Sequence, residues 1–279
     1  MSVLELGSLA GPLVVFGGPY SNLAATQAMK KVAQEMKLSP QQVICTGDIV
    51  AYCAEPEETI KLVQDWGIHV VMGNCEESVA YNKDDCGCGF EEGSACDLLS
   101  DNWYRYASSH ISKHSKEWMK QLPERIHFTF NNKSFCVIHG GVSEKNRFIF
   151  HSTDTNLKRD EIHHSGSDVV IAGHCGIPFG QQVDNNYWLN AGVIGMPAND
   201  GTQNGWYLIL QAHGDTIQAC WKILKYDYIQ AFEAMQSAGL SHHYADALKS
   251  GIWPSMEVLP TAERQNKGHA IMEKILVIH

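Results

Sequence analysis

Four short motifs carry the residues of this sequence that are best suited to bind a metal ion. Each places a glycine next to a carboxylate, amide or imidazole side chain, directly after an apolar run that is typical of a buried strand. The ligand residues are Asp48, Asn74, His139 and His174, in the segments Thr46-Gly47-Asp48, Gly73-Asn74-Cys75-Glu76, Ile138-His139-Gly140-Gly141 and Ala172-Gly173-His174-Cys175. The carboxyl ends of strands in an α/β sheet share one edge, where ligands bind, so we expect these side chains to converge. Such a mixed oxygen and nitrogen set suits Mn, Fe, Zn or Co.

A second group of candidate ligands lies in the loop 82–96, which is rich in Gly, Asp and Cys. If this loop folds back over the strand ends, Cys86 and Cys88 are additional candidate metal ligands. Their C-x-C spacing is not that of a standard zinc knuckle, so an irregular Gly-rich lid is the alternative. The 9 cysteines of the chain are scattered and odd in number, which favours reduced thiols over a disulfide framework.

The elements that must position the motifs alternate between strand and helix in the first third of the chain. Apolar runs predict strands at 13–16, 43–45 and 68–72, and the stretches between them predict helices at 22–36 and 56–66. This alternation predicts parallel strands joined by crossover helices.

Beyond the Cys-rich loop, the pattern changes to paired helices and then to a series of short strands. Helices are expected at 97–108 and 112–121, which together with the loop form a helical insertion at about 82–122. Later strands are expected at 125–130, 134–138, 168–172, 180–183, 186–189, 205–211 and 215–223, and later helices at about 226–238 and 242–249. We therefore expect an α/β domain over residues 1–225, with residues 226–279 as a helical appendage packed on it.

The overall charge excludes several classes of partner. The 279 residues include 21 Lys and Arg against 31 Asp and Glu, a net charge of −10, so nucleic acid binding is not expected. Nothing in the sequence is long and apolar enough to span a membrane, which takes about 18 apolar residues or more. The start of the chain has no basic segment and carries Glu5, unlike a secretory signal, so we expect a cytoplasmic protein.

The order of the motifs resembles that of the calcineurin-like metallophosphoesterases over roughly residues 12–222. The blocks around Asp48, Asn74, His139 and His174 match in sequence order, and Asn190-Ala191-Gly192-Val193 resembles a late block of that family. The resemblance implies an α/β fold with four layers (αββα), in which two mixed sheets pack face to face with helices outside. It also implies a two-metal centre that activates water to attack phosphorus. By this resemblance Asp48 is the metal-bridging carboxylate, and the other three residues complete one metal site.

The sequence departs from the family pattern at one of the two metal sites. The Asp-x-His block at the end of the first strand reads Gly18-Pro19-Tyr20, followed by Asn22, and the second His of the late Gly-His-x-His block is Gly176. These three lost ligands belong to the same metal site, so we expect one metal ion per chain in preference to two. If the backbone here keeps the family's path, restoring the three ligands should recover a second ion. Cys75 stands where many members carry a histidine that protonates the leaving group.

Two functions remain open from the sequence. The first is a metal-dependent phosphatase or phosphodiesterase that acts on a small phosphate ester or nucleotide. In it, Asp48, Asn74 and His139 are the catalytic residues. The substrate-binding residues are Tyr20, Asn22 and Cys75. The alternative is a weak or inactive protein that binds a metal or nucleotide on the same scaffold, or a metal centre rebuilt with thiols. The oligomeric state is open.

Overall fold

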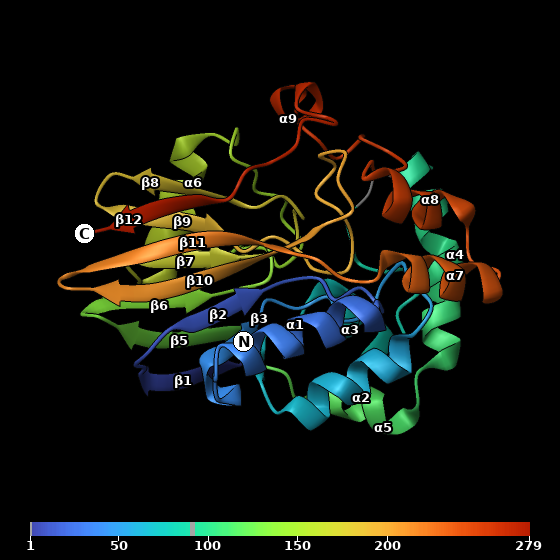
Figure 1. Cartoon of the computed structure of the whole chain (residues 1–279), viewed down its shortest axis with the longest axis horizontal. Helices are drawn as coiled ribbons and strands as arrows, with labels where there is room; N and C mark the ends of the chain where they lie inside the picture. The colour runs from blue at the N-terminus through green and yellow to red at the C-terminus, as the bar shows by residue number, and fades with distance from the viewer. Residues whose placement is uncertain (1, 90–92) are drawn as a thin grey trace.

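Two six-stranded sheets pack face to face, and helices cover their outer faces (Figure 1). The description rests on a computed structural model in which residues 2–89 and 93–279 are described. The predicted α/β sandwich of four layers is confirmed, with both sheets mixed in strand direction.

The sheet that carries the first two ligand motifs has the order β12-β11-β10-β2-β3-β4. Its strands are β2 (Leu13–Phe16), β3 (Val43–Cys45), β4 (His69–Val70), β10 (Gly205–His213), β11 (Thr216–Leu224) and β12 (Lys274–Ile278). Strands β2, β3 and β4 run parallel, and the β10–β11 hairpin pairs antiparallel with β2. The parallel part places the ends of β3 and β4 at one edge.

The second sheet has the order β1-β5-β6-β7-β9-β8 and carries the two histidine motifs. Its strands are β1 (Val3–Ser8), β5 (Arg125–Phe130), β6 (Lys133–Val137), β7 (Val169–Ala172), β8 (Phe179–Val183) and β9 (Asn186–Asn190). Strands β6, β7 and β9 run parallel. The ends of β6 and β7 therefore lie beside each other, which brings the two histidines together.

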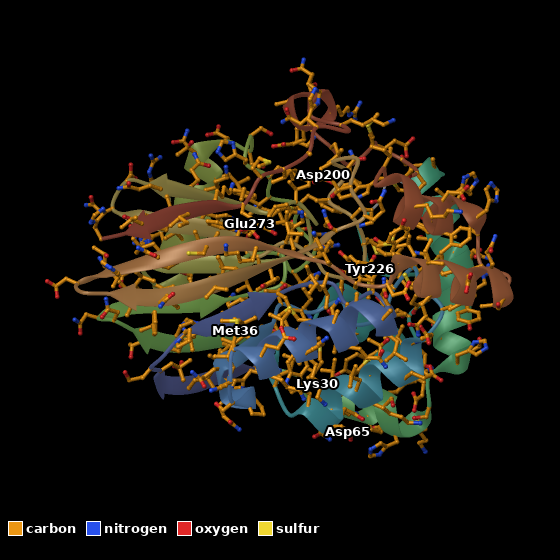
Figure 2. The ribbon with its side chains drawn as sticks, in the orientation of Figure 1. Lys30, Met36, Asp65, Asp200, Tyr226 and Glu273 are labelled. Atoms are coloured by element: carbon orange, nitrogen blue, oxygen red, sulfur yellow. A yellow bond between two sulfur atoms is a disulfide. The ribbon has the colours of Figure 1, made fainter. Side chains whose placement is uncertain are left out.

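Alternation along β2 shows how the layers are built. Leu13 and Val15 pack into the core between the sheets, whereas Val14 and Phe16 face α1 (Leu23–Glu35) and α2 (Pro56–Trp66). This is the period of two expected for a strand that is buried on both faces. On the opposite side, α6 (Thr155–Ser165) covers the second sheet. Charged side chains such as Asp65 lie on the outer surface of the helical layer (Figure 2).

Most of the remaining helices gather beyond the carboxyl ends of the strands, at the right of Figure 1. They include α4 (Ala95–His110), α7 (Tyr228–Ser237) and α8 (His242–Ser250), whose buried residues belong to the same core as α1 and α2. Two short helices, α3 (Asn74–Ala80) and α5 (Lys113–Met119), pack against each other, and α9 (Thr261–Gln265) precedes the last strand. Among the described residues, no helix has the length and apolarity that a membrane crossing requires.

The structure corrects the expected organisation in two places. The segment 226–279 is not only helical, because β12 pairs with β11 and completes a sheet. The expected elements also omit β1, which forms an edge of the other sheet, and α6 between the two histidine motifs. Both edge strands have largely exposed side chains. Strand β1 mixes apolar with polar residues, whereas β12 contains an apolar run at 275–278, a strand signal that sequence reasoning missed.

Candidate metal centre

Asp48 is held by a tight turn that follows β3. Gly47 has a φ of +98°, and a side chain on it would come within 2.7 Å of the backbone nitrogen of Gly73. The turn therefore packs directly on the loop that follows β4, where Asn74 begins α3. Asp48 itself adopts a left-handed φ of +57°, which Asp tolerates better than most residues. This contact of two loops brings the first two candidate ligands together.

Glu76 ties the same two loops together, and sequence reasoning did not assign it a role. Its side chain is fully buried and accepts backbone N–H bonds from Asp48 (2.7 Å), Val50 (3.1 Å) and Gly73 (3.0 Å). Burial raises the pKa of Glu76 to about 7, and the charge of Asp48 adds to this effect. A signal was present in the sequence, because a Glu three residues after a helix N-cap commonly bonds back to the cap backbone.

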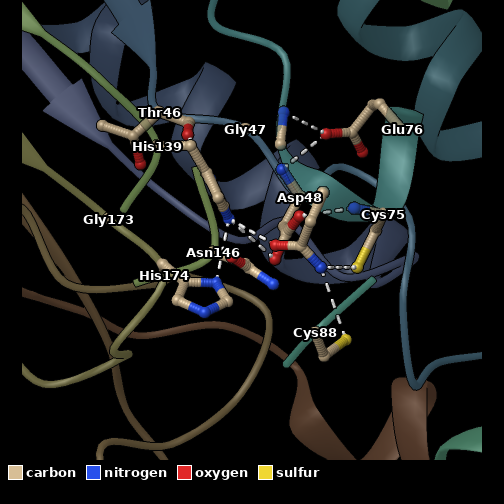
Figure 3. Close-up of polar contacts among 12 residues, drawn as sticks. Thr46, Gly47, Asp48, Cys75, Glu76, Cys88, His139, Asn146, Gly173 and His174 are labelled. Carbon is tan, nitrogen blue, oxygen red and sulfur yellow. Dashed lines mark hydrogen bonds and ion pairs between the residues drawn. The ribbon is translucent and has the colours of Figure 1, made fainter. Parts of the chain in front are cut away.

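The four predicted ligand side chains meet at one nitrogen atom, Nε2 of His139 (Figure 3). This atom lies 3.0 Å from Oδ1 of Asn74, 3.0 Å from Nδ1 of His174 and 3.3 Å from Oδ2 of Asp48. The other ring nitrogen of His139 lies 2.7 Å from the carbonyl oxygen of Thr46, which assigns the hydrogen to Nδ1. The lone pair of Nε2 then faces the other candidate ligands, as in a metal-binding histidine.

A divalent cation fits this donor set on chemical grounds. The facing oxygens of Asn74 and Asp48 carry no hydrogen, so they can only accept. A hydrogen on the ring of His174 could bond to at most one of the acceptors around it, which leaves the others without a donor. The donor atoms of Asp48, His139 and His174 all lie within 4.8 Å of one another, so one ion can contact them together. Asn74 turns its oxygen inward because its nitrogen donates to the carbonyl of Cys86 at 3.0 Å. The ligand roles themselves stay a prediction.

The pKa shifts indicate the same preference for positive charge. Burial alone would raise the pKa of Asp48, but the facing imidazole of His139 outweighs it and lowers the pKa below its usual range. Burial alone would lower the pKa of His139, but Asp48 reverses the shift and raises it. Burial, together with the neighbouring His139, lowers the pKa of His174 to about 3, so its ring stays neutral. A neutral imidazole is the form that binds metals.

Tyr20 occupies the space that the missing ligands leave. Its ring is 5% exposed, and a side chain on Gly18 would come within 2.5 Å of it. A side chain on Gly176 would come within 3.1 Å of the Trp253 ring. Both glycines have positive φ angles, +44° and +73°. The positions of the missing ligands are therefore filled by aromatic rings.

A cavity of about 80 Å³ opens next to the candidate metal centre. Asp48 and His174 of the centre line this cavity, together with Tyr20. Tyr52, Tyr244 and Trp253 also line it, and none of these three was predicted as a site residue. They come from a loop, from α8 and from the segment after α8, so nothing local in the sequence connects them.

The other two predicted substrate contacts lie elsewhere. Asn22 is fully buried, accepts the N–H of Ala25 at 3.0 Å and donates to the carbonyl of Gly195 at 2.9 Å. It therefore caps α1 and anchors a loop, and it is not among the residues that line the cavity, so its substrate contact stays a prediction. Cys75 is buried under the centre, where its backbone N–H donates to Asp48 at 3.2 Å, and it is not among the residues that line the cavity.

Cys86 and Cys88 are joined by a disulfide, so the expectation of reduced thiols is wrong for this pair. Cys88 lies close to the candidate ligands, with its sulfur 3.4 Å from the amide nitrogen of Asn74. As a disulfide the pair offers no thiolate, so metal ligation by Cys86 and Cys88 stays a prediction for the reduced form. The other seven cysteines are free and buried.

Residues 23–215 match the calcineurin-like phosphoesterase superfamily domain, which agrees with the sandwich and the four motifs just described. The chain belongs to this superfamily. It is similar to the uncharacterized protein MJ0912 of Methanocaldococcus jannaschii, with 24% identity over 242 residues that cover 79% of this chain and 90% of that protein.

Two solved structures share the fold. One is a metallophosphoesterase from Sphaerobacter thermophilus, with a TM-score of 0.68 and 17% identity, covering 88% of this chain and 100% of that chain. The other is the hypothetical protein PH1004 from Pyrococcus horikoshii OT3, with a TM-score of 0.73 and 14% identity, covering 87% and 99%. At these identities the likeness shows the fold.

Proposed function

We propose that this protein is a metal-dependent phosphoric ester hydrolase with one divalent ion per chain. The observation that carries the proposal is the convergence of three further donor groups on Nε2 of His139. Mn, Fe, Zn and Co all suit this set of one carboxylate, one amide and two imidazoles. Such an ion supplies a Lewis acid that polarises the phosphoryl group and lowers the pKa of water.

The protein residues have separate tasks in this proposal. Thr46 fixes the ring of His139, and the carbonyl of Cys86 fixes the amide of Asn74, so both ligands are oriented before an ion binds. Asp48 and Asn74 orient the phosphoryl group and the attacking water. Burial raises the pKa of the Cys75 thiol well above its usual range, so Cys75 stays protonated beside Asp48.

The environment proposed for this enzyme follows from its surface and its thiols. The net charge of −10 favours a small phosphorylated substrate over nucleic acid or a membrane surface. Seven free, buried cysteines support a location in the cytoplasm.

The test combines metal content with hydrolysis. Protein purified without chelator should contain one equivalent of metal and hydrolyse p-nitrophenyl phosphate or its diester. His139→Ala and His174→Ala should each lose both the metal and the activity. His163→Ala, which changes an exposed histidine on α6, is the matched control and should keep both. Wild-type activity in both ligand variants would refute a metal-centred reaction.

A second candidate is a protein that binds a metal and a ligand without turnover. The observation in its favour is that aromatic rings fill the positions of the missing ligands, beside Gly18 and Gly176. In that case the metal equivalent persists, and no ester is hydrolysed above the rate of the His139→Ala variant.

A further inference from the structure

The cavity beside the candidate metal centre has an apolar, aromatic wall. Besides Tyr20, Tyr52, Tyr244 and Trp253, it is lined by Phe148 and Val193. Among the described residues that line it there is no lysine or arginine. Asp48 and His174 of the candidate metal centre also line it. A ligand here therefore contacts both the metal centre and the aromatic wall.

Two of the positions that depart from the family pattern, Tyr20 and Gly176, also line this cavity. Tyr20 contributes a ring, and Gly18 has to lack a side chain because that ring lies 2.5 Å from where its Cβ would be. Gly176 lines the cavity and lies against Trp253. Loss of a ligand set by drift would leave small or unrelated residues. Here the changes combine into one continuous aromatic surface.

The tyrosines of this wall pack against one another. The rings of Tyr20 and Tyr52 lie 4.8 Å apart in an edge-to-face contact, and Tyr52 lies 4.6 Å from Tyr244. Tyr20 and Tyr244 are more than nine-tenths buried, so these rings form a fixed side of the cavity.

The volume of the cavity limits the size of the group that can bind in it. An enclosed apolar cavity of about 150 Å³ holds benzene, roughly twice the volume found here. A second hollow of about 370 Å³ adjoins the cavity and shares Cys96, Phe148 and Val258 with it. By volume, a compact apolar group fits the cavity, and a whole aromatic ring needs the space of the outer hollow as well.

We infer that the cavity binds the organic group of the substrate, and that this substrate is a single phosphate esterified to an aromatic or apolar alcohol. The inference rests on the proposed function and narrows its substrate class. Hydrolysis forms a bond from water oxygen to phosphorus and breaks the ester P–O bond, and the alcohol leaves with one proton of that water. Polyphosphate nucleotides fit less well, because no lysine or arginine lines the cavity itself to balance their additional charges. Arg264 lines the outer hollow, but its side chain already donates to the carbonyls of Leu259 and Glu257.

Binding of phosphonates tests this without turnover, because their C–P bond resists hydrolysis. Calorimetry with the Mn²⁺-loaded protein compares benzylphosphonate, methylphosphonate and ADP. Benzylphosphonate should bind about tenfold or more tightly than methylphosphonate, since burying an aromatic ring is worth at least that factor. ADP should bind less tightly than benzylphosphonate. Equal affinities for the two phosphonates, or a preference for ADP, would overturn the inference.

Substitutions in the cavity wall test which residues cause the preference for benzylphosphonate over methylphosphonate. Trp253→Ala should reduce the ratio of the two phosphonate affinities at least fivefold and leave methylphosphonate binding within twofold, which also reports an intact fold. Trp118→Ala removes a partly buried tryptophan of α5 that does not line the cavity, and should keep the ratio. If Trp253→Ala does not fold, Ser255→Phe narrows the cavity from a partly buried lining position and should reduce the ratio likewise. An unchanged ratio in the variant that folds refutes the assignment.

The two proposals fail in different ways. Hydrolysis of p-nitrophenyl phosphate with no preference for benzylphosphonate leaves the proposed function in place and removes the substrate class. A preference for benzylphosphonate in a protein that hydrolyses no ester removes the enzymatic function and supports the ligand class.

Discussion

Replacing Asn22 separates the structural role found here from the substrate contact that its sequence position predicts. The Asn22 side chain accepts the N–H of Ala25 at 3.0 Å, which caps α1, and donates to the carbonyl of Gly195 at 2.9 Å. The second bond matters for the site, because the N–H of Gly195 in turn donates to the carbonyl of Gly18 at 2.8 Å. Asn22 therefore clamps the loop that carries Gly18 and Tyr20.

The two bonds give the expected cost of Asn22→Ala. Loss of a helix N-cap costs about 1 kcal/mol. A buried carbonyl that loses its donor costs about 1–3 kcal/mol, and Gly195 would keep only the weak thiol contact of Cys53 at 3.9 Å. The free energy of unfolding should therefore fall by about 2–4 kcal/mol. Asn22→Ser keeps a cap but is too short to reach Gly195, so it should lose about 1–3 kcal/mol.

Urea unfolding followed by tryptophan fluorescence measures both costs. Ser112→Ala is the matched control: it removes the cap of α5, together with a hydrogen bond from Ser112 to the hydroxyl of Ser115 at 3.1 Å, and should cost about 1 kcal/mol. The reasoning is refuted if Asn22→Ala costs no more than this control. It is refuted equally if Asn22→Ser keeps the wild-type stability but weakens methylphosphonate binding, because Asn22 would then contact the ligand.

Two further substitutions test the packing of the site. Gly18→Ala should lower the free energy of unfolding by roughly 2 kcal/mol or more, because φ is positive and the new side chain overlaps the Tyr20 ring. Gly67→Ala is the control, with a positive φ but open space around it, and should cost about 1 kcal/mol. Equal costs in urea unfolding would contradict this. Glu76→Ala leaves three buried backbone N–H groups without this acceptor, so it should lower the free energy of unfolding by about 3 kcal/mol or more and weaken metal binding. Glu77→Ala breaks only partly exposed ion pairs and should cost about 1 kcal/mol or less. A metal titration and thermal unfolding of the two variants check this.

The inner strands of the fold could be predicted because strands that are buried on both faces consist of apolar residues. Strand β2 is apolar at every position, and Gly17-Gly18 marks its end. Strand β1 lacks such a run, whereas β12 has one at 275–278 that sequence reasoning missed. In β1 the side chain of Val3 is 48% exposed, and in β12 that of Ile275 is 63% exposed, so edge pairing and not burial defines these strands. Their partners lie far away in sequence.

Helix α6 shows a different limit. Its segment is polar almost throughout, and it ends in His163-His164, which gives no apolar periodicity. The helix forms because Ile162 packs on the second sheet and because Asp154 accepts the N–H of Asn156 at 2.8 Å. Tertiary contacts of this kind stabilise a helix whose local sequence shows no apolar periodicity.

The same division applies to the site. The four candidate ligands could be predicted because each lies immediately after a strand, so sheet geometry alone brings them together. The cavity wall could not, because Tyr52, Tyr244 and Trp253 reach it from separate segments. Taken one at a time, Gly18 and Tyr20 look like two independent losses. In the structure they are one change, because the ring of Tyr20 needs the space that Gly18 leaves.

This coupling reverses one expectation from the sequence, that Gly18→Asp, Tyr20→His and Gly176→His together recover a second metal ion. Removing the Tyr20 ring makes room for a side chain at residue 18. At residue 176, however, φ is +73°, and a Cβ would lie 3.1 Å from the Trp253 ring. A histidine there has a strained backbone and crowds the Trp253 ring, so we expect that it does not complete a second metal site.

The triple variant should therefore keep a single metal equivalent by elemental analysis, with no gain in hydrolysis. Adding Trp253→Ala removes the obstructing ring but leaves the strained backbone at residue 176, so the quadruple variant should bind a second ion only weakly. Metal content measured in parallel for the wild type shows the baseline. Two tightly bound equivalents in the triple variant would mean that Trp253 yields to the new side chain. The aromatic side chains would then be easily displaced from the positions of the missing ligands. The ligand class inferred from the aromatic wall would lose its main support.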